Sequence, residues 1–230
     1  MYPHGVDVAP AGPPGLPGLI ETLRVREGRV PLLAQHAARL ERSLADLGLP
    51  RPPDDLAALV DPHLGRGDAI VRVEVRDGRA SVATREVREP EPMRLITATV
   101  PHAPYRHKTT ARDAFERAAR EAWAAGADEA LLLTAGRLVA EATVWSVFWW
   151  EGEAVRTPAL GLHVLPGVAR ARIAALVSVG EAWSGRGELG GKSLFLANAA
   201  RGIVTVAALD GEEVPGDRRT ADLARRFWKV

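Results

Sequence analysis

The sequence predicts an α/β fold in which mixed strands and helices (α+β) form two subdomains with a ligand cleft between them. Short apolar or alternating runs typical of strands recur along the chain, and runs with helical spacing lie between them. A proline-containing linker near residue 104 divides this order into two halves. We expect a smaller N-terminal subdomain over 1–103 and a larger C-terminal one over 104–230, with the site at their boundary, because ligand sites favour domain interfaces.

The first half begins with an irregular, proline- and glycine-rich lead-in over 9–18. The patterns after it predict, in order, a strand over 19–25, a turn at 27–28, a helix ending at Gly48, a short helix from Asp54 and a strand towards Val100. Between the short helix and that strand, valines alternate with charged residues on both sides of Asp77-Gly78, which predicts a β-hairpin.

The second half is predicted to open with a helix. Thr110 and Asp113 have the spacing of a capping box, and Gly126 is placed to end the helix. The apolar runs EALLL, SVFWW, SLFLA and IVTVAAL predict strands, and the patterns over 167–177 and 217–228 predict helices.

Composition excludes several classes of function. The net charge of +1, from 30 basic and 29 acidic residues, provides no general attraction to nucleic acid or anionic membrane. The absence of cysteine excludes disulfides and thiolate chemistry, and the six histidines lack the spacing of a metal site. No apolar run reaches membrane-spanning length, and the first residues do not resemble a signal peptide. We therefore expect a cytoplasmic protein that binds neither nucleic acid, membrane nor metal.

Lys108 is one of only three lysines, with Lys192 and Lys229, among the 30 basic residues; all the others are arginine. Arginine keeps its proton in proteins, whereas a lysine amine can lose it and form a Schiff base with a carbonyl. By composition alone Lys108 could be incidental. Its place where the linker meets a helix, near the expected cleft, favours a chemical role.

Two further side chains have chemical as well as structural interpretations. Arg39 lies on a helix whose apolar face is otherwise accounted for, so its guanidinium could bind a phosphate or pair with a surface acid such as Glu41. Glu141 lies between apolar neighbours, where a carboxylate needs a partner such as a protonated pyridine nitrogen, unless it faces water at a strand end.

Two turns could bind anions through backbone amides. Gly167, Val168 and Ala169 form a turn into a helix, and Asn198 and Ala199 end a strand. Neither turn is specific alone. Together with Lys108, Arg39 and Glu141, they provide an imine-forming amine, an acid for a ring nitrogen and contacts for a phosphate, which are the groups needed to hold pyridoxal phosphate (PLP).

The order of these segments over residues 18–210 resembles the class IV, or D-amino-acid-aminotransferase-like, PLP enzymes. The resemblance rests on GLIETLRVREGRVPLLAQHAARLERSLADLG, on HKTTARDAFERAAREAWAAGADEALLLTAGRLVAEATVWSVFWW, on TPALGLHVLPGVAR and on FLANAARGIVTV. It implies a homodimer acting on a small amino substrate, with the cofactor in a cleft between the subdomains. It also implies roles for individual residues: covalent attachment of PLP for Lys108 of the K-x-x-x-R motif, phosphate binding for Arg39 and for the turn at Gly167, Val168 and Ala169, and the pyridine nitrogen for Glu141.

Two stretches resemble one member of the family, 4-amino-4-deoxychorismate lyase, which forms 4-aminobenzoate and pyruvate for folate synthesis. They are VFWWEGEAVRTPAL and the pair Asn198 and Ala199, where aminotransferases tend to carry Ser or Thr. The resemblance also implies that Thr22 helps to deliver a proton to the departing group. A strand threonine bonded to backbone is the structural alternative.

Two other functions stay open. One is a class IV aminotransferase acting on branched-chain or D-amino acids, which would need a keto acid as second substrate. The other is a degenerate, non-catalytic scaffold, because Ser146 stands where the family usually has Asn and Ala169 where it often has Thr. The joint presence of Lys108, Arg39 and Glu141 argues against the scaffold.

Overall fold

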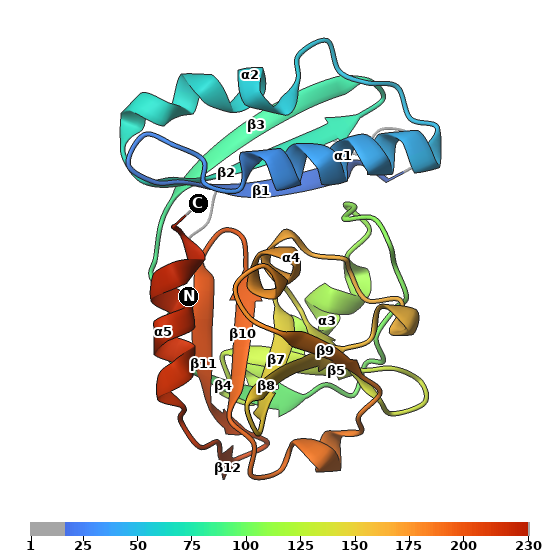
Figure 1. The fold of residues 1–230 in the computed structure, drawn as a ribbon. Helices are drawn as coiled ribbons and strands as arrows, with labels where there is room; N and C mark the ends of the chain where they lie inside the picture. Colours follow the sequence, from blue (N-terminus) through green and yellow to red (C-terminus); the bar gives the residue numbers. More distant parts are fainter. Residues whose placement is uncertain (1–16, 230) are drawn as a thin grey trace.

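The protein folds into two lobes, one above the other in Figure 1, in a computed structural model that describes residues 17–229. The upper lobe has a three-stranded sheet with the order β1-β2-β3 and two α-helices packed on it. The lower lobe has a nine-stranded sheet and three further α-helices. The expected lead-in over 9–18 lies almost wholly outside the described residues.

The upper lobe is built around a hairpin and one long helix. Its elements are β1 (Leu19–Val25), α1 (Leu33–Leu47), α2 (Leu56–Val60), the 3-10 helix η1 (Asp61–Arg66), β2 (Ala69–Arg76) and β3 (Arg79–Glu86). The predicted turn at Asp77-Gly78 joins β2 and β3, and both residues have positive φ. Gly48 ends α1 in the left-handed conformation, as its position predicts.

Alternation along the upper strands decides which side chains face the helices. Leu23, Val71 and Val73 pack with Leu40 and Leu44 of α1 in one apolar cluster. Because successive strand residues point to opposite faces, the intervening residues of β1, β2 and β3 lie on the other face of the sheet, which is turned towards the lower lobe.

The lower sheet has the strand order β6-β5-β4-β11-β10-β7-β8-β9, with β12 paired to β11. Its strands are β4 (Met93–Thr97), β5 (Glu129–Leu133), β6 (Val139–Ala142), β7 (Ser146–Glu151), β8 (Ala154–Pro158), β9 (Val179–Ala182), β10 (Leu194–Asn198), β11 (Gly202–Leu209) and β12 (Glu212–Glu213). The helices are α3 (Asp113–Ala124), α4 (Val168–Ala174), α5 (Arg218–Phe227) and the 3-10 turns η2 (Leu160–Leu162) and η3 (Arg186–Leu189).

The central strands of this sheet are buried on both faces, which explains their unbroken apolar runs. Val147 and Trp149 of β7 belong to one core cluster, while Phe148 and Trp150 belong to another that includes residues of α4 and α5. Leu32, just before α1, packs in the second cluster and joins the lobes.

The chain passes from the upper to the lower sheet between Glu86 and Met93, before the expected division at residues 103 and 104. β4 lies within the expected first subdomain, yet it pairs in parallel with β5 and β11 of the large sheet. Local periodicity identifies a strand here but not its partners, since those are far away in the sequence.

The predicted capping box at the start of α3 is wrong. The helix begins at Asp113, and its N-cap is Arg112. Thr110 instead pairs with the chain before β1: its N–H donates to the carbonyl of Gly18, and its Oγ1 accepts from the N–H of Gly18. Because Gly18 uses both the N–H and the Oγ1 of Thr110, this side chain does not cap the helix.

The helices within residues 17–229 are all too short or too polar to span a membrane.

Candidate active site

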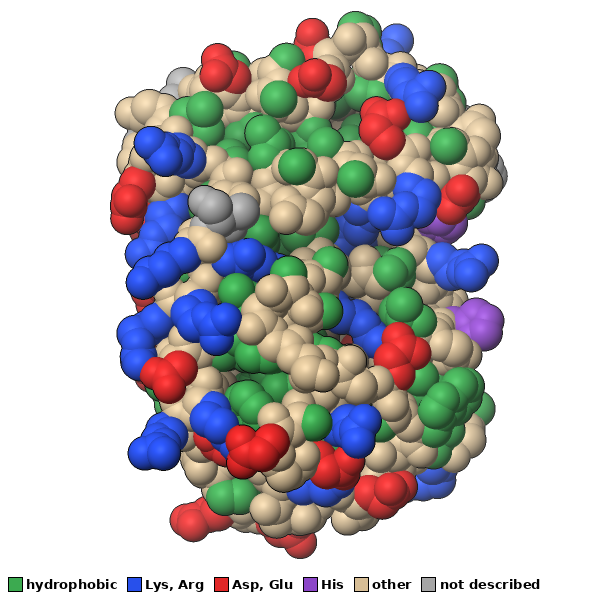
Figure 2. Space-filling model, viewed as in Figure 1, with side chains coloured by type: hydrophobic (Ala, Val, Ile, Leu, Met, Phe, Trp, Pro, Cys, Tyr) green, Lys and Arg blue, Asp and Glu red, His purple; other side chains and the backbone are tan. Residues whose placement is uncertain are grey.

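A cavity of about 190 Å³ lies where the two lobes meet, with the underside of the upper sheet on one side and the ends of lower-lobe strands on the other. Figure 2 shows Lys and Arg side chains along this junction. All the site residues predicted from the sequence lie on the cavity wall: Thr22, Arg39, Lys108, Glu141, Gly167, Val168, Ala169, Asn198 and Ala199.

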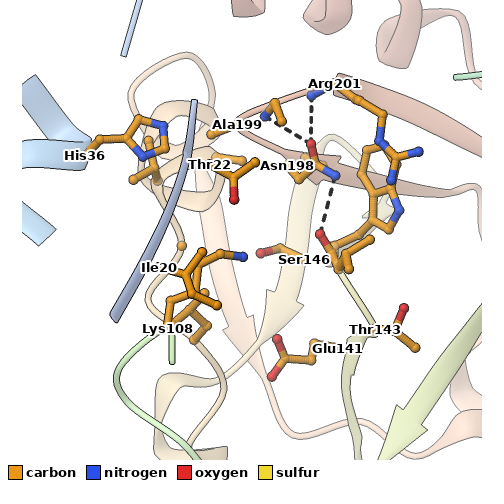
Figure 3. A pocket seen from close by; sticks show the side chains of 18 of the residues that line it. Ile20, Thr22, His36, Lys108, Glu141, Thr143, Ser146, Asn198, Ala199 and Arg201 are labelled. Carbon is orange, nitrogen blue, oxygen red and sulfur yellow. Dashed lines mark hydrogen bonds between the residues drawn. The ribbon is translucent and has the colours of Figure 1, made fainter. Parts of the chain in front are cut away.

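Lys108 is positioned by backbone pairing with β1. Its carbonyl accepts from the N–H of Ile20 at 2.8 Å, and Thr109 forms a bridge with Leu19. The side chain points into the cavity, with Thr22 and Ser146 on the surrounding walls (Figure 3). Burial and the nearby guanidinium groups of Arg39 and Arg112 lower the pKa of the Lys108 amine to about 7. Near neutral pH, a substantial fraction of this amine is therefore unprotonated and nucleophilic.

Arg39 is buried and forms a pair with Glu21, not with a surface acid such as Glu41. Its Nε donates to Oε1 of Glu21 at 2.8 Å and its Nη2 to Oε2, while Nδ1 of His36 lies 2.6 Å from Oε2. Burial would raise the pKa of Glu21, but Arg39 and His36 outweigh it and lower that pKa to about 2. The pair fixes Arg39 at the cavity wall, and within residues 17–229 its Nη1 makes no hydrogen bond.

Glu141 is also buried, so it does not face water at a strand end. Its Oε1 lies 2.7 Å from Nε2 of His102, and its Oε2 accepts from the hydroxyl of Tyr105 at 2.8 Å. Burial, reinforced by the charge of Glu141, raises the pKa of Tyr105 well above its usual value, so the phenol stays protonated and donates. Two donors from the linker thus hold this carboxylate at the cavity wall.

The turn at Gly167 is the N-cap of α4, with extended backbone. A Cβ at position 167 would lie 3.2 Å from Oγ of Ser146, so glycine permits the close approach of the turn to β7. The side chains of Val168 and Ala169 pack into the lower core. These two residues therefore present mainly backbone to the cavity.

Asn198 organises the turn between β10 and β11. Its Oδ1 accepts from the N–H groups of Ala200 at 3.1 Å and Arg201 at 2.7 Å, and its Nδ2 donates to the carbonyl of Val144 at 3.4 Å (Figure 3). The side chain thus occupies two amides of this turn. The expected anion contact is restricted to the amides before them, around Ala199.

The cavity also has lining residues that the sequence did not nominate as site residues: His36, Arg72, Arg85, Tyr105, Arg112, Thr143 and Arg201. Arg112 follows Lys108 in the K-x-x-x-R motif, and its guanidinium donates to the carbonyl of Thr143 and lies 4.6 Å from the ring centre of Phe115. In the sequence, the charged residues of β2 and β3 have the alternating pattern of a solvent-facing side of a hairpin. No local signal therefore separates the cavity-lining Arg72 and Arg85 from the other charged residues of these strands.

Comparisons with known proteins agree with this arrangement. The sequence model of the family "Amino-transferase class IV" matches residues 18–209. No curated protein matches the chain in sequence.

Similar solved structures include a proposed 4-amino-4-deoxychorismate lyase from Legionella pneumophila. It has a TM-score of 0.83 and 22% identity, over 96% of this chain and 97% of the other. A proposed amino-acid aminotransferase from Mesorhizobium loti has a TM-score of 0.78 and 27% identity, over 83% and 99% of the two chains. A branched-chain aminotransferase from Thermoproteus uzoniensis has a TM-score of 0.80 and 23% identity, over 92% and 84%.

These likenesses confirm the mixed α/β fold expected from the sequence, and the family match covers most of the chain. Members of the family depend on PLP, act on small amino substrates and are typically homodimers. The chain belongs to the class IV aminotransferase family of PLP-dependent enzymes.

Proposed function

We propose that this protein is a PLP-dependent lyase that converts 4-amino-4-deoxychorismate to 4-aminobenzoate and pyruvate. The observation that carries the proposal is the position of Lys108, whose amine has a pKa of about 7 and points into a cavity that Arg39 and Glu141 also line. A scaffold without chemistry has no need to hold a lysine with a lowered pKa beside the charges of Arg39 and Arg112 at a cavity wall.

The residues present fit PLP in charge and in chemistry. Nη1 of Arg39 and the amides at the start of α4 suit a phosphate group, because they offer donors and positive potential. The clamped carboxylate of Glu141 suits a protonated ring nitrogen. When bound, PLP would supply a carbonyl for covalent attachment and a ring that accepts the electron pair left when a C–H bond breaks.

Lys108 would have two tasks in this reaction. Its neutral amine would be the group that holds the cofactor covalently, and once freed by the substrate amine it would be the base that takes the proton from the carbon bearing the substrate nitrogen. The C–O bond on the adjacent carbon of the substrate ring would then break, and the enolpyruvyl group would leave and become pyruvate on protonation. Loss of this group would make the substrate ring aromatic. Glu141 would hold the protonated ring nitrogen of the cofactor, because His102 and Tyr105 fix its carboxylate at the cavity wall and a carboxylate stabilises a neighbouring positive charge.

Thr22 is the proposed donor towards the leaving group. It lies on the cavity face of β1, and its strand partner is Arg72 of β2. A hydroxyl here can pass a proton to the departing enolpyruvate without a charged acid at the site. Asn198 and Ala199, on the opposite wall, are the pair that favoured a lyase from the sequence.

An aminotransferase acting on branched-chain or D-amino acids is the second candidate, supported by the fold of the Thermoproteus uzoniensis enzyme. It would use the same lysine, arginine and glutamate. The two candidates differ in their co-substrate, because only the aminotransferase requires a keto acid. We also propose that the chain forms a homodimer, as is typical of the family.

The test begins with the absorption spectrum of the purified protein with added PLP, followed by borohydride reduction and peptide mapping. We expect PLP to be fixed on Lys108. Label spread over Lys192 and Lys229 would contradict cofactor binding at this site. Release of 4-aminobenzoate from 4-amino-4-deoxychorismate without a keto acid distinguishes the lyase, whereas turnover only of amino-acid and keto-acid pairs would favour the aminotransferase.

A further inference from the structure

The cavity has walls from both lobes, so its shape depends on how the lobes are held together. Thr22 and Arg39 belong to the upper wall, whereas Glu141 belongs to the lower one. A cofactor that needs both Arg39 and Glu141 is bound only by molecules in which the lobes are close. Contacts between the lobes therefore contribute to the affinity for PLP even where they lie outside the cavity.

The strand β1 is attached to the lower lobe at its first residues. The N–H of Ile20 donates to the carbonyl of Lys108 at 2.8 Å, and the N–H of Thr110 donates to the carbonyl of Gly18 at 2.8 Å. Arg24 lies towards the other end of β1, on the same face as Ile20, because every second residue of a strand faces the same way. A second attachment at Arg24 would hold the whole strand over the cavity.

Arg24 is buried between the lobes, with only 4% of its surface exposed. Its Nη2 donates to Asp68 at 3.1 Å and to Glu89 at 2.9 Å, and its Cζ lies 5.9 Å from the ring centre of Trp228, within the range of a cation–π contact. Asp68 comes just before β2, Glu89 lies between the two sheets, and Trp228 follows α5, which ends just below the upper lobe (Figure 1). One guanidinium thus contacts the upper lobe, the connecting segment and the lower lobe.

Trp228 is in turn fixed against two walls of the cavity. A Cβ at Gly202 would lie 3.1 Å from Nε1 of Trp228, so the indole packs directly on the backbone at the start of β11. Gly202 pairs with Asn198, and the turn between them lines the cavity. Nε of Arg172 in α4 donates to the carbonyl of Phe227 at 2.8 Å, which ties the residues around Trp228 to the helix whose first turn is expected to bind phosphate.

We propose that Arg24 and Trp228 form a latch that holds the two lobes closed and positions the upper and lower walls of the cavity for PLP. Neither residue lines the cavity, so both act through β1, the turn before β11 and α4. The inference goes beyond the proposed function, since it applies to a lyase and to an aminotransferase alike. A cation–π contact shielded from water is strong enough to change an equilibrium constant about tenfold.

The test replaces Trp228 in two ways. Trp228→Leu keeps an apolar side chain but removes the aromatic face, whereas Trp228→Phe keeps a ring for Arg24. Fluorescence titration of the full-length protein measures the affinity for PLP. We expect a loss of about tenfold in Trp228→Leu and in Arg24→Gln, and an affinity close to that of wild type in Trp228→Phe. Trp183→Leu is the matched control, because Trp183 is an exposed tryptophan of the lower lobe outside the cavity.

The reactivity of Lys108 in the PLP-free protein provides a second readout. Burial and the charges of Arg39 and Arg112 lower the pKa of this amine. Of the smaller influences, Glu21 raises it and Arg72 lowers it. A tenfold loss of PLP affinity through opening means that closed molecules have fallen to about a tenth of the total. Lys108 would then meet water in most molecules, so its acetylation should begin at higher pH in the variants that lose affinity and only in those.

Urea denaturation of each variant verifies that it is folded. A lower unfolding free energy with unchanged PLP affinity and an unchanged Lys108 profile would mean that the pair only packs, and it would overturn the latch. Equal losses of affinity in Trp228→Leu and Trp228→Phe, or a loss in Trp183→Leu, would also overturn it. The double variant of Arg24→Gln and Trp228→Leu should bind PLP no more weakly than either single variant, because both substitutions break one contact. Additive losses would contradict that coupling.

The two readouts separate this inference from the proposed function. If PLP does not attach to Lys108, or if no 4-aminobenzoate forms, the proposed function fails, and the acetylation profile of Lys108 still decides the latch. If 4-aminobenzoate forms but the substitutions at Arg24 and Trp228 change neither the PLP affinity nor that profile, the lyase stands and the latch is wrong.

Discussion

Arg39 and Glu21 form a bidentate ion pair inside the upper lobe, with Nε of Arg39 2.8 Å from Oε1 and Nη2 2.5 Å from Oε2. Arg39 comes from α1 and Glu21 from β1, so the pair joins the helix to the sheet at the cavity wall. His36, one turn before Arg39 on the same helix, contacts the same carboxylate. One buried acid thus positions two side chains that line the cavity.

Removing this acid should destabilise the protein. Glu21→Gln leaves the buried guanidinium of Arg39 without its counter-charge, which costs about 3–5 kcal/mol of unfolding free energy for a buried pair. Urea denaturation measures the loss. Glu41→Gln is the control, because the pair of Glu41 with Arg51 is exposed and should contribute less than about 1 kcal/mol. Equal effects of the two substitutions would contradict the assigned importance of the Arg39 pair.

The same acid should make stability depend on pH in a defined window. Its folded pKa of about 2 lies below the ordinary value of 4.5, so the folded state binds its proton less readily than the unfolded state. The contribution of Glu21 is therefore fully present above pH 4.5 and is lost as pH falls towards 2. Urea midpoints of wild type and Glu21→Gln, compared across this range, should converge at low pH. A constant difference would show that Glu21 does not titrate in this window.

Lys108 should react with amine reagents at unusually low pH. Since its pKa is about 7, the neutral amine becomes the main form above that pH, whereas the pKa of an ordinary lysine is 10.5. Brief acetylation of the PLP-free protein, followed by mass spectrometry of the peptide, should give a labelling rate that rises through pH 7. A lysine model peptide in the same tube is the reference. Parallel profiles for the two would refute the lowered pKa.

Lys108 is also the residue whose loss should abolish covalent PLP binding. Lys108→Ala removes the amine, and Lys108→Arg keeps a charge but cannot form an imine, so both should prevent borohydride from fixing PLP to the protein. Lys192→Ala is the control, because Lys192 pairs with Glu151 outside the cavity and its loss should leave PLP attachment intact. Retained labelling in both Lys108 variants would exclude Lys108 as the attachment site.

His102 should support cofactor binding through Glu141. His102→Asn removes the ring nitrogen that lies 2.7 Å from the Glu141 carboxylate, and a lost hydrogen bond to a charged group should weaken PLP binding about tenfold. Fluorescence titration of the variant with PLP measures the affinity. His163→Asn, at an exposed position outside the cavity, should bind PLP as wild type does. An unchanged affinity in the His102 variant would mean that Tyr105 alone holds the carboxylate.

Much of the fold could be predicted from local patterns. Alternation marked the hairpin of β2 and β3, helical spacing marked α1, and Asp77-Gly78 and Gly48 marked where the chain turns, because strand and helix periods and positive φ are properties of a few neighbouring residues. The resemblance to the family also indicated that Lys108, Arg39 and Glu141 belong to one site.

What the sequence alone determined is therefore the set of elements and the residue types able to bind PLP, since both are encoded in short stretches. Only the tertiary structure decided which of these groups meet. Thr110 pairs with Gly18 instead of capping α3, β4 joins the large sheet, Glu21 holds Arg39, and one face of the hairpin turns Arg72 to the cavity. These contacts join residues far apart in the chain, and their energies of burial and pairing override local preference.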